Sequence, residues 1–394
     1  LTVVWVVGGI AGLCGGLSYA ELGAALPKSG GEYHFLNEIY HPCAGFISGW
    51  VSATVGFAAP TALAALTLGS YLGASGLSVN PTWVATVAIV LLTAAHCTSH
   101  RRSGGTQTIF TLVKLILILG FSAAALLLGS TDHQADFTWT SDSGALLGSG
   151  AFAVSLIYVN YAYSGWNAAT YISGELASPQ KSLPWVLGIS TTLVAVLYCL
   201  LNYVFLSVAP MDAMIGKVEI GVIAAEFAFG STLGASMGLL LALLLISTIS
   251  AMILAGPRVL QRIGQDYPRF APLARQNRDG IPVTAILLQS STALLFLWSA
   301  SFEQILVFSG ATMALNTFAT VLGLFILRWR QPELRRPFRV SFYPITPLIF
   351  LGITGWTLTY IVLQRPVEAL ITAAILASGG VFYLLVRAPR GAAG

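Results

Sequence analysis

The sequence predicts an all-α polytopic membrane protein, and three observations carry that prediction. Of its 394 residues, 56% are hydrophobic and only 9% are charged, whereas soluble domains carry about 25% charged residues. The mean hydropathy is +0.80. Apolar runs follow one another along the chain, and each is long enough to cross the ~30 Å hydrocarbon core of a bilayer as a helix. This composition excludes a soluble globular domain.

Short polar loops separate the apolar runs, and no soluble domain or repeat of fixed period interrupts them. We therefore expect one transmembrane domain over residues 1–394. Its eleven predicted spans lie at about 1–24, 43–73, 82–98, 107–129, 144–175, 184–209, 233–260, 281–300, 304–327, 342–363 and 367–387. The chain contains 40 glycines, as expected where membrane helices pack closely or break.

The basic residues predict the orientation of these spans. When loops are assigned to alternate sides, one side collects 17 of the 19 lysines and arginines, and the other keeps only Lys217 and Arg365. By the positive-inside rule the first side is cytoplasmic, which places the C-terminus inside and Leu1 outside, in the plasma (inner) membrane. Because the chain begins within an apolar run and not at a methionine, we expect N-terminal truncation and a twelfth span upstream.

The first predicted span ends near Glu21, and two later spans end near Glu175 and Arg258. All three charges lie at the predicted cytoplasmic ends. They form a possible inner gate of ion pairs that break and re-form as access to the membrane centre alternates. The alternative interpretation is that they are ordinary interfacial charges in water.

The fourth span contains Lys114, in an otherwise apolar stretch. An unpaired lysine in hydrocarbon costs a few kcal/mol, so one interpretation is a fixed cation that occupies an ion site, or a group that exchanges a proton. The alternative is that the side chain extends to the nearby cytoplasmic interface.

The fifth span, residues 144–175, is the unusual one. As a continuous helix it would be nearly 50 Å long at ~1.5 Å per residue, well beyond the bilayer core. Its middle carries polar and aromatic residues around a glycine, where lipid depth is greatest: Asn160, Tyr161, Tyr163, Ser164, Gly165, Trp166 and Asn167. This pattern favours a helix broken at the membrane centre, although a kinked structural helix that bonds to neighbouring spans would also explain it.

A helix that unwinds at Tyr163–Asn167 exposes carbonyls on its first half and amides on its second. The carbonyls suit an ammonium group, and the amides suit a carboxylate. We therefore assign substrate binding to Tyr163, Ser164, Gly165, Trp166 and Asn167. Carbonyls around Tyr163–Gly165 would hold the ammonium group, whereas Trp166 and Asn167 would shape the pocket for the rest of the solute.

The seventh span carries three hydroxyls at membrane depth, on Ser247, Thr248 and Ser250. Bonds to carbonyls of their own helix explain them, and a role in binding an ion or the substrate is the alternative.

Other chemistry is not indicated by the sequence. The four cysteines are scattered singly and form no ligand spacing with the five histidines, so we expect no metal and no disulfide. No phosphate loop, nucleophile–base pair or nucleic-acid-binding face is present. We therefore expect no enzyme activity, no cofactor and no nucleic-acid partner, and the sequence leaves any partner subunit open.

Several motifs together resemble one family, the amino acid–polyamine–organocation (APC) superfamily, and within it the L-amino-acid-transporter-like permeases. The resemblance covers nearly the whole chain. It is carried by residues 18–23 (SYAELG), 28–33 (KSGGEY), 163–167 (YSGWN) with Gly174 and Glu175, 179–184 (PQKSLP), 257–259 (PRV) and 328–340 (RWRQPELRRPFRV).

The resemblance implies a LeuT-type fold with two inverted five-helix repeats, and a substrate held between the broken first and sixth helices. On this mapping residues 144–175 are the sixth helix, and Lys114 is the fifth-helix lysine that replaces sodium in sodium-independent members. The family's first helix, with its glycine-rich unwound turn, has no counterpart in this sequence.

The function implied is secondary active transport of amino acids by alternating access. We expect Na⁺-independent exchange or proton-linked uptake, with a neutral amino acid as the partner solute and the lipid bilayer as the environment. The alternative is a membrane sensor or assembly subunit that has the same fold and does not transport.

Overall fold

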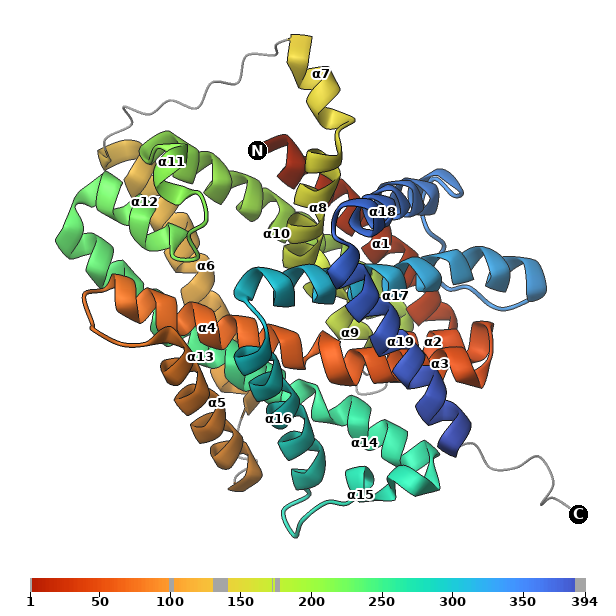
Figure 1. The fold of residues 1–394 in the computed structure, drawn as a ribbon. Coiled ribbons are helices and arrows are strands. Elements are labelled where there is room, and N and C mark those ends of the chain that lie inside the picture. The colour runs from red at the N-terminus through yellow and green to blue at the C-terminus, as the bar shows by residue number, and fades with distance from the viewer. Residues whose placement is uncertain (1, 99–102, 130–140, 172, 174–177, 387–394) are drawn as a thin grey trace, which may run out of the picture.

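The computed structural model describes residues 2–98, 103–129, 141–171, 173 and 178–386. Every long regular element within those ranges is a helix (Figure 1). The predicted all-α membrane architecture is therefore confirmed, and the chain is an integral multi-pass membrane protein.

Nine stretches of the described residues are helical, long and apolar enough to cross a membrane. They are α1 (Thr2–Ala25), α3–η1–α4 (Pro42–Val51, Ser52–Gly56 and Ala58–Ala74), α5 (Pro81–Thr98), α6 (Ser103–Leu128), α10 (Pro179–Val208), α13–α14 (Ser231–Ala255 and Pro257–Asp266), α17 (Phe302–Arg330), α18 (Ile345–Gln364) and α19 (Pro366–Val386).

The two remaining predicted spans are also helical, but they are shorter or interrupted. One is α16 (Val283–Ser299). The other consists of α8 (Gly150–Tyr163), η2 (Ser164–Asn167) and α9 (Ala168–Tyr171). Each of the eleven predicted spans thus has a helical counterpart.

Shorter helices lie mostly in segments that the sequence predicted as loops, and one of them, α7, also overlaps the start of the predicted span 144–175. They are α2 (Glu32–Ile39), α7 (Ser141–Leu147), α11 (Met211–Met214), α12 (Ile220–Phe229), η4 (Pro268–Phe270) and α15 (Ala271–Ala274). The first of these helices lies inside the protein: α2 packs against α3 and α17, and most of its side chains are buried.

Local sequence explains where several helices begin. The side chain of Asn80 accepts backbone hydrogen bonds from Thr82 and Trp83 and so caps α5. Ser301 and Gln304 form a capping box at the start of α17. Pro257, which has no amide hydrogen to donate, separates α13 from α14.

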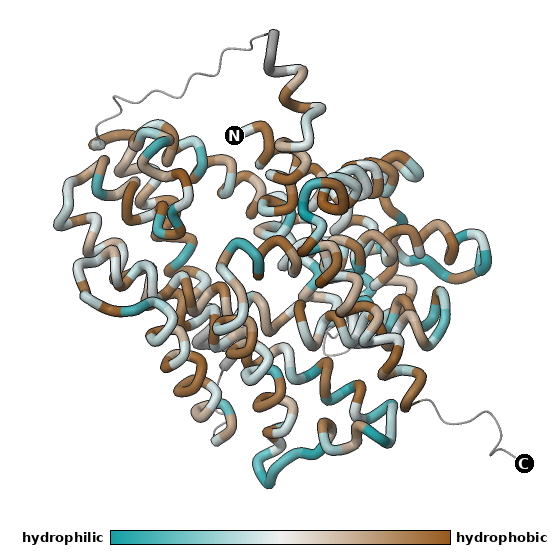
Figure 2. Tube along the Cα trace, in the orientation of Figure 1, coloured by the Kyte–Doolittle hydropathy of each residue, from teal (hydrophilic) through white to brown (hydrophobic). Residues whose placement is uncertain are grey.

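Burial divides the spans into an inner and an outer set. In α17, 72% of the residues in its most apolar stretch are buried inside the protein. The corresponding share is 17% in each of α5, α6 and α10. The outer helices expose large apolar side chains such as Leu91, Ile116 and Ile189, and Figure 2 shows the hydrophilic residues concentrated in the loops. The outer set therefore faces lipid, whereas α1, α3–η1–α4 and α17 form most of the interior (Figure 1).

Glycines on α1 permit a close approach to the interrupted helix. A Cβ atom on Gly8 would lie 2.4 Å from a methyl group of Val159 on α8, and one on Gly15 would lie 2.8 Å from the ring of Phe350 on α18. Larger residues at either position would force α1 away from these helices.

Candidate functional site

The predicted break at the membrane centre is present, in a different form from the one expected. The α-helix ends at Tyr163, Ser164–Asn167 form one turn of 3₁₀ helix, and α9 begins at Ala168. The backbone is tightened rather than unwound. Gly165 does not have a positive φ, and a Cβ atom there would meet no other atom within 4 Å, so this conformation does not need the backbone freedom of glycine.

Two hydroxyls accompany the tightened turn. The Ser164 hydroxyl donates to the Tyr161 carbonyl at 2.7 Å, and the Thr170 hydroxyl donates to the Asn167 carbonyl at 2.7 Å. Side chains of this type satisfy carbonyls that a regular helix would pair. The serine of the polar run thus has a local structural explanation for its position.

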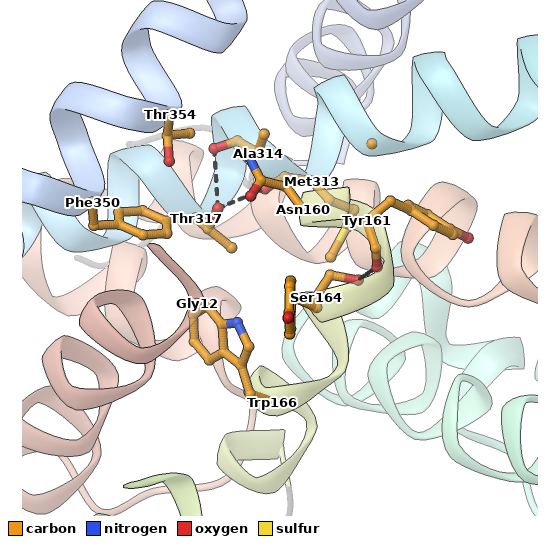
Figure 3. A pocket seen from close by; sticks show the side chains of 12 residues that line it. Gly12, Asn160, Tyr161, Ser164, Trp166, Met313, Ala314, Thr317, Phe350 and Thr354 are labelled. Atoms are coloured by element: carbon orange, nitrogen blue, oxygen red, sulfur yellow. Dashed lines mark hydrogen bonds between the residues drawn. The ribbon is translucent and has the colours of Figure 1, made fainter. Parts of the chain in front are cut away.

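A cavity lies beside this turn, between the interrupted helix and α1, α17 and α18 (Figure 3). Its atom-free space, which includes space open to the outside, is about 440 Å³. Its walls are Gly12, Asn160, Tyr161, Tyr163, Ser164, Trp166, Gly310, Met313, Ala314, Thr317, Phe350 and Thr354.

The polar side-chain groups at this cavity are hydroxyls, the Asn160 amide and the Trp166 indole N–H, and none of its lining residues carries a charge. The Tyr161 hydroxyl is buried and has no hydrogen-bond partner among the described residues. The Tyr161 ring points away from the cavity in Figure 3 and packs against the core cluster that contains Val55 and Phe308, so Tyr161 borders the cavity without directing its hydroxyl into it.

Tyr163 and Trp166 line the cavity and also fasten the turn to α1. The Tyr163 hydroxyl donates to the Trp5 carbonyl at 3.1 Å, and the Trp166 ring stands edge-on to Tyr19 with centroids 4.6 Å apart. Both aromatic residues therefore stand at the wall of the cavity on the side of α1.

Asn167 lies elsewhere. It is buried and does not line the cavity. Its side-chain amide donates to Glu32 Oε1 at 2.7 Å, and the same oxygen accepts a hydrogen bond from the Tyr19 hydroxyl at 3.0 Å. The sequence interpretation gave Asn167 a direct place in the solute pocket, whereas this conformation turns its side chain toward α2.

Lys114 bonds to the seventh predicted span. Its ammonium donates to the Thr248 hydroxyl at 2.8 Å, so it joins α6 to α13. Two residues further along α13, the Ser250 hydroxyl lies 2.8 Å from His96 Nε2 on α5. Thr248 and Ser250 therefore make contacts between helices. The bond to Thr248 also distinguishes Lys114 from a side chain that only extends to the interface.

The predicted inner gate does not assemble as expected. Glu21 is almost fully buried and pairs with Arg328 at 2.6 Å and Arg336 at 3.6 Å, rather than with Arg258. Its carboxylate also accepts the backbone amide of Val340. It is neither a water-exposed charge nor a partner of Arg258, because the loop after α17 folds back over it. Glu175 lies outside the described residues.

A second, larger cavity opens beside α9, with about 2140 Å³ of atom-free space. Unlike the first, it is lined by charged residues, among them Lys28, Arg258 and Arg262. At its wall the Tyr33 hydroxyl donates to Asp266 at 2.5 Å. Burial and Asp266 raise the pKa of Tyr33 well above its usual value, so this hydroxyl stays protonated and remains a donor.

Sequence reasoning missed several residues that line the first cavity. Its list of site residues omitted Tyr161 and the whole contribution of α17 and α18. The available signal was the run of polar residues along an apolar helix, at Thr312, Asn316, Thr317 and Thr320, all of them buried. Within the described residues, no group of three histidine, cysteine, aspartate or glutamate side chains is arranged to hold a metal ion.

Comparison with known proteins adds independent information. Residues 1–385 match the sequence profile of the family described as "Amino acid permease". Similar proteins include the mouse "Large neutral amino acids transporter small subunit 2" and the mouse "Asc-type amino acid transporter 1", each 27% identical over 97% of this chain and 73% of the relative. The human "b(0,+)-type amino acid transporter 1" is 26% identical over 97% of this chain and 80% of its own length.

Proposed function

Because this chain belongs to the amino acid permease family, we propose that it moves neutral amino acids across a membrane by alternating access, without sodium. Its membership of the family makes it an amino acid transporter of the APC superfamily rather than an enzyme. The choice of neutral substrates, the independence of sodium and the mechanism are our proposals.

The observation that carries the mechanism is the interrupted helix between two cavities. The 3₁₀ turn at Ser164–Asn167 borders the uncharged cavity through Ser164 and Trp166. Ala168 and Tyr171, on the next half-helix, border the charged cavity. A solute held at the turn can therefore be reached from one side or the other when the half-helices tilt.

Neutral substrates are supported by the lining of the first cavity. It contains no aspartate, glutamate, lysine or arginine, so nothing there would pair with a charged side chain. Met313, Ala314 and Phe350 suit an apolar side chain, and the Asn160 amide and the Thr354 hydroxyl offer hydrogen bonds to a polar end of the solute. The name of one relative, a transporter of large neutral amino acids, agrees with this choice.

Independence of sodium is supported by Lys114. Its ammonium lies between α6 and α13 and bonds to a hydroxyl. A fixed positive charge there would repel a cation and can take its structural place. We propose that Lys114 has this role, and that exchange or proton-linked uptake supplies the driving force.

We further propose that the basic loops and the C-terminus face the cytoplasm of a plasma (inner) membrane. The distribution of lysine and arginine supports this orientation. The charged cavity contains Arg258 and Arg262 from the same basic side, so it would be the cytoplasmic entrance.

Counterflow in liposomes tests the proposed function. Purified protein is reconstituted into vesicles loaded with unlabelled L-leucine, and radiolabelled L-leucine is supplied outside in sodium-free buffer. We expect saturable accumulation that unlabelled leucine inhibits and that lysine and glutamate do not. An absence of counterflow for every amino acid would contradict transport, and saturable binding without flux would instead indicate a sensor.

A further inference from the structure

One buried acid near the site has no place in the proposed function so far. Glu32 is fully buried and is the first residue of α2. It follows Gly30 and Gly31, which have φ values of 124° and 53°. Non-glycine residues rarely adopt such values, and a Cβ atom on Gly31 would lie 3.1 Å from the Thr170 hydroxyl and the Tyr171 ring. The two glycines thus bring the carboxyl group against α9.

The contacts of Glu32 are unusual for a buried carboxyl group. Its Oε1 atom accepts hydrogen bonds from Asn167 and Tyr19, at 2.7 and 3.0 Å. Its Oε2 atom is buried and makes no hydrogen bond of ordinary length to the described residues, although the Tyr171 hydroxyl lies near the same carboxyl group. Within the part of the chain that the structure describes, no cation forms an ion pair with it. Such a group is costly to bury, so packing alone does not explain its presence.

Two further bonds connect the same turn to the inner half-helix. The Gly31 amide donates to the Thr170 carbonyl at 3.2 Å, and the Ser173 hydroxyl donates to the Lys28 carbonyl at 3.0 Å. Together with the bond between Glu32 and Asn167, these contacts join residues 28–32 to the segment that begins at the 3₁₀ turn. The turn that precedes α2 is therefore connected to α9, and the two form one unit.

We propose that Glu32 is a positioning residue for transport. Its Oε1 atom holds Asn167, the last residue of the 3₁₀ turn, and so sets where Ser164 and Trp166 lie in the cavity. Because Glu32 also bonds to Tyr19 on α1, it fixes the distance between the turn and α1. This role rests on the proposed function, since it acts through the residues that line the proposed substrate cavity.

The proposed role depends on a pairing of acceptor and donor, so exchanging the two chemistries tests it. Glu32→Gln keeps an acceptor oxygen and should stay within about threefold of native transport. Asn167→Asp places two carboxyl groups in contact and should raise the KM for L-leucine about tenfold or more. The double variant Glu32→Gln/Asn167→Asp again pairs an amide with a carboxylate, and should return to within about threefold of native.

The measurement is counterflow of radiolabelled L-leucine at about neutral pH, with KM and maximal rate determined per amount of folded protein. Glu333→Gln, an exposed acid that lines neither cavity, is the control and should transport as the native protein does. Size-exclusion profiles and thermal unfolding midpoints show whether each variant folds. Neither the single Asn167→Asp variant nor the double variant shortens a buried side chain, so their comparison is not affected by a new cavity.

Three results would overturn the role of Glu32: normal transport by Asn167→Asp, no rescue in the double variant, or a loss greater than about tenfold in Glu32→Gln alone. Failure to rescue would mean that Asn167 acts independently of Glu32. If the native protein itself does not transport, the proposed function fails instead, so the two failures are distinguishable.

Discussion

At the scale of single residues, the contacts of Lys114 and His34 have measurable consequences. Lys114 is a cation in a span whose other side chains are nearly all apolar, and its bond to Thr248 joins two helices. His34 lies outside the spans, on α2, and is largely buried. Each residue supports one prediction.

Removing the Lys114 bond should impair transport. Hydrogen bonds to charged groups contribute about 1.5–3 kcal/mol, so Lys114→Ala and Thr248→Val should each reduce counterflow by about tenfold or more. Thr359→Val is the matched control, because that exposed threonine bonds only to a carbonyl of its own helix. Normal exchange by Lys114→Ala would remove the role assigned to this lysine.

Acidification should destabilise the protein through His34. Burial lowers the pKa of His34, opposed by Glu38 and assisted by Lys28 and Arg262. The folded state therefore binds fewer protons than the unfolded state, whose histidine pKa is about 6.5. This contribution to stability is present above that pH and is lost as the pH falls below it. In purified protein, His34→Gln should reduce the drop in thermal midpoint between neutral and mildly acidic pH, and an unchanged drop would contradict this assignment.

At the scale of elements, the loop after α17 is held by a buried ion pair. Glu21 on α1 faces Arg328 and Arg336, and Arg336 is itself almost fully buried. Arg328 also stacks over the ring of Tyr343 at 3.7 Å. These contacts connect α1 to α17 and to the loop that follows it, and they explain why Glu21 is buried.

Neutralising Glu21 should therefore destabilise the fold. Removing one partner of a buried pair typically costs about 3–5 kcal/mol, because the other charge is left without compensation. We expect Glu21→Gln to lower the thermal unfolding midpoint clearly, while Glu333→Gln, an exposed acid in the same loop, leaves it unchanged. Equal midpoints for the two variants would show that the ion pair does not hold the loop.

The cavity beside the 3₁₀ turn can be tested by filling it. Ala314 lines the cavity on α17, whereas its neighbour Leu315 is exposed on the outer surface of the same helix. Ala314→Phe should reduce the affinity for L-leucine about tenfold or more, while Leu315→Phe should bind normally. Isothermal titration of the two purified variants makes the comparison, and equal affinities would place the substrate elsewhere.

At the scale of the whole molecule, the sequence predicted the spans and the position of the break. The predicted span 144–175 is too long for the bilayer core, and the polar segment at its centre marked residues 163–167. The sequence could not predict that this turn would be 3₁₀, because a tightened and an unwound backbone use the same residue types.

Pairings between distant segments were also beyond the sequence. Arg328 follows Glu21 by 307 residues, whereas Arg258 was an equally plausible partner by charge and predicted depth. Similarly, Glu32 has the appearance of a loop acid until the turn at Gly30 and Gly31 directs it inward. Polar residues of α17 such as Thr312 and Thr317 bond to carbonyls of their own helix, so composition alone does not distinguish a residue that lines a cavity from one that only packs.

The central claim is that an amino acid binds at the interrupted helix, and an experimental density map of the protein with bound L-leucine tests it most directly. The account predicts leucine density beside Ser164, between Tyr161 and the α17 wall at Met313–Thr317. Density confined to the charged cavity near Arg258, with the turn at residues 164–167 left empty, would contradict it.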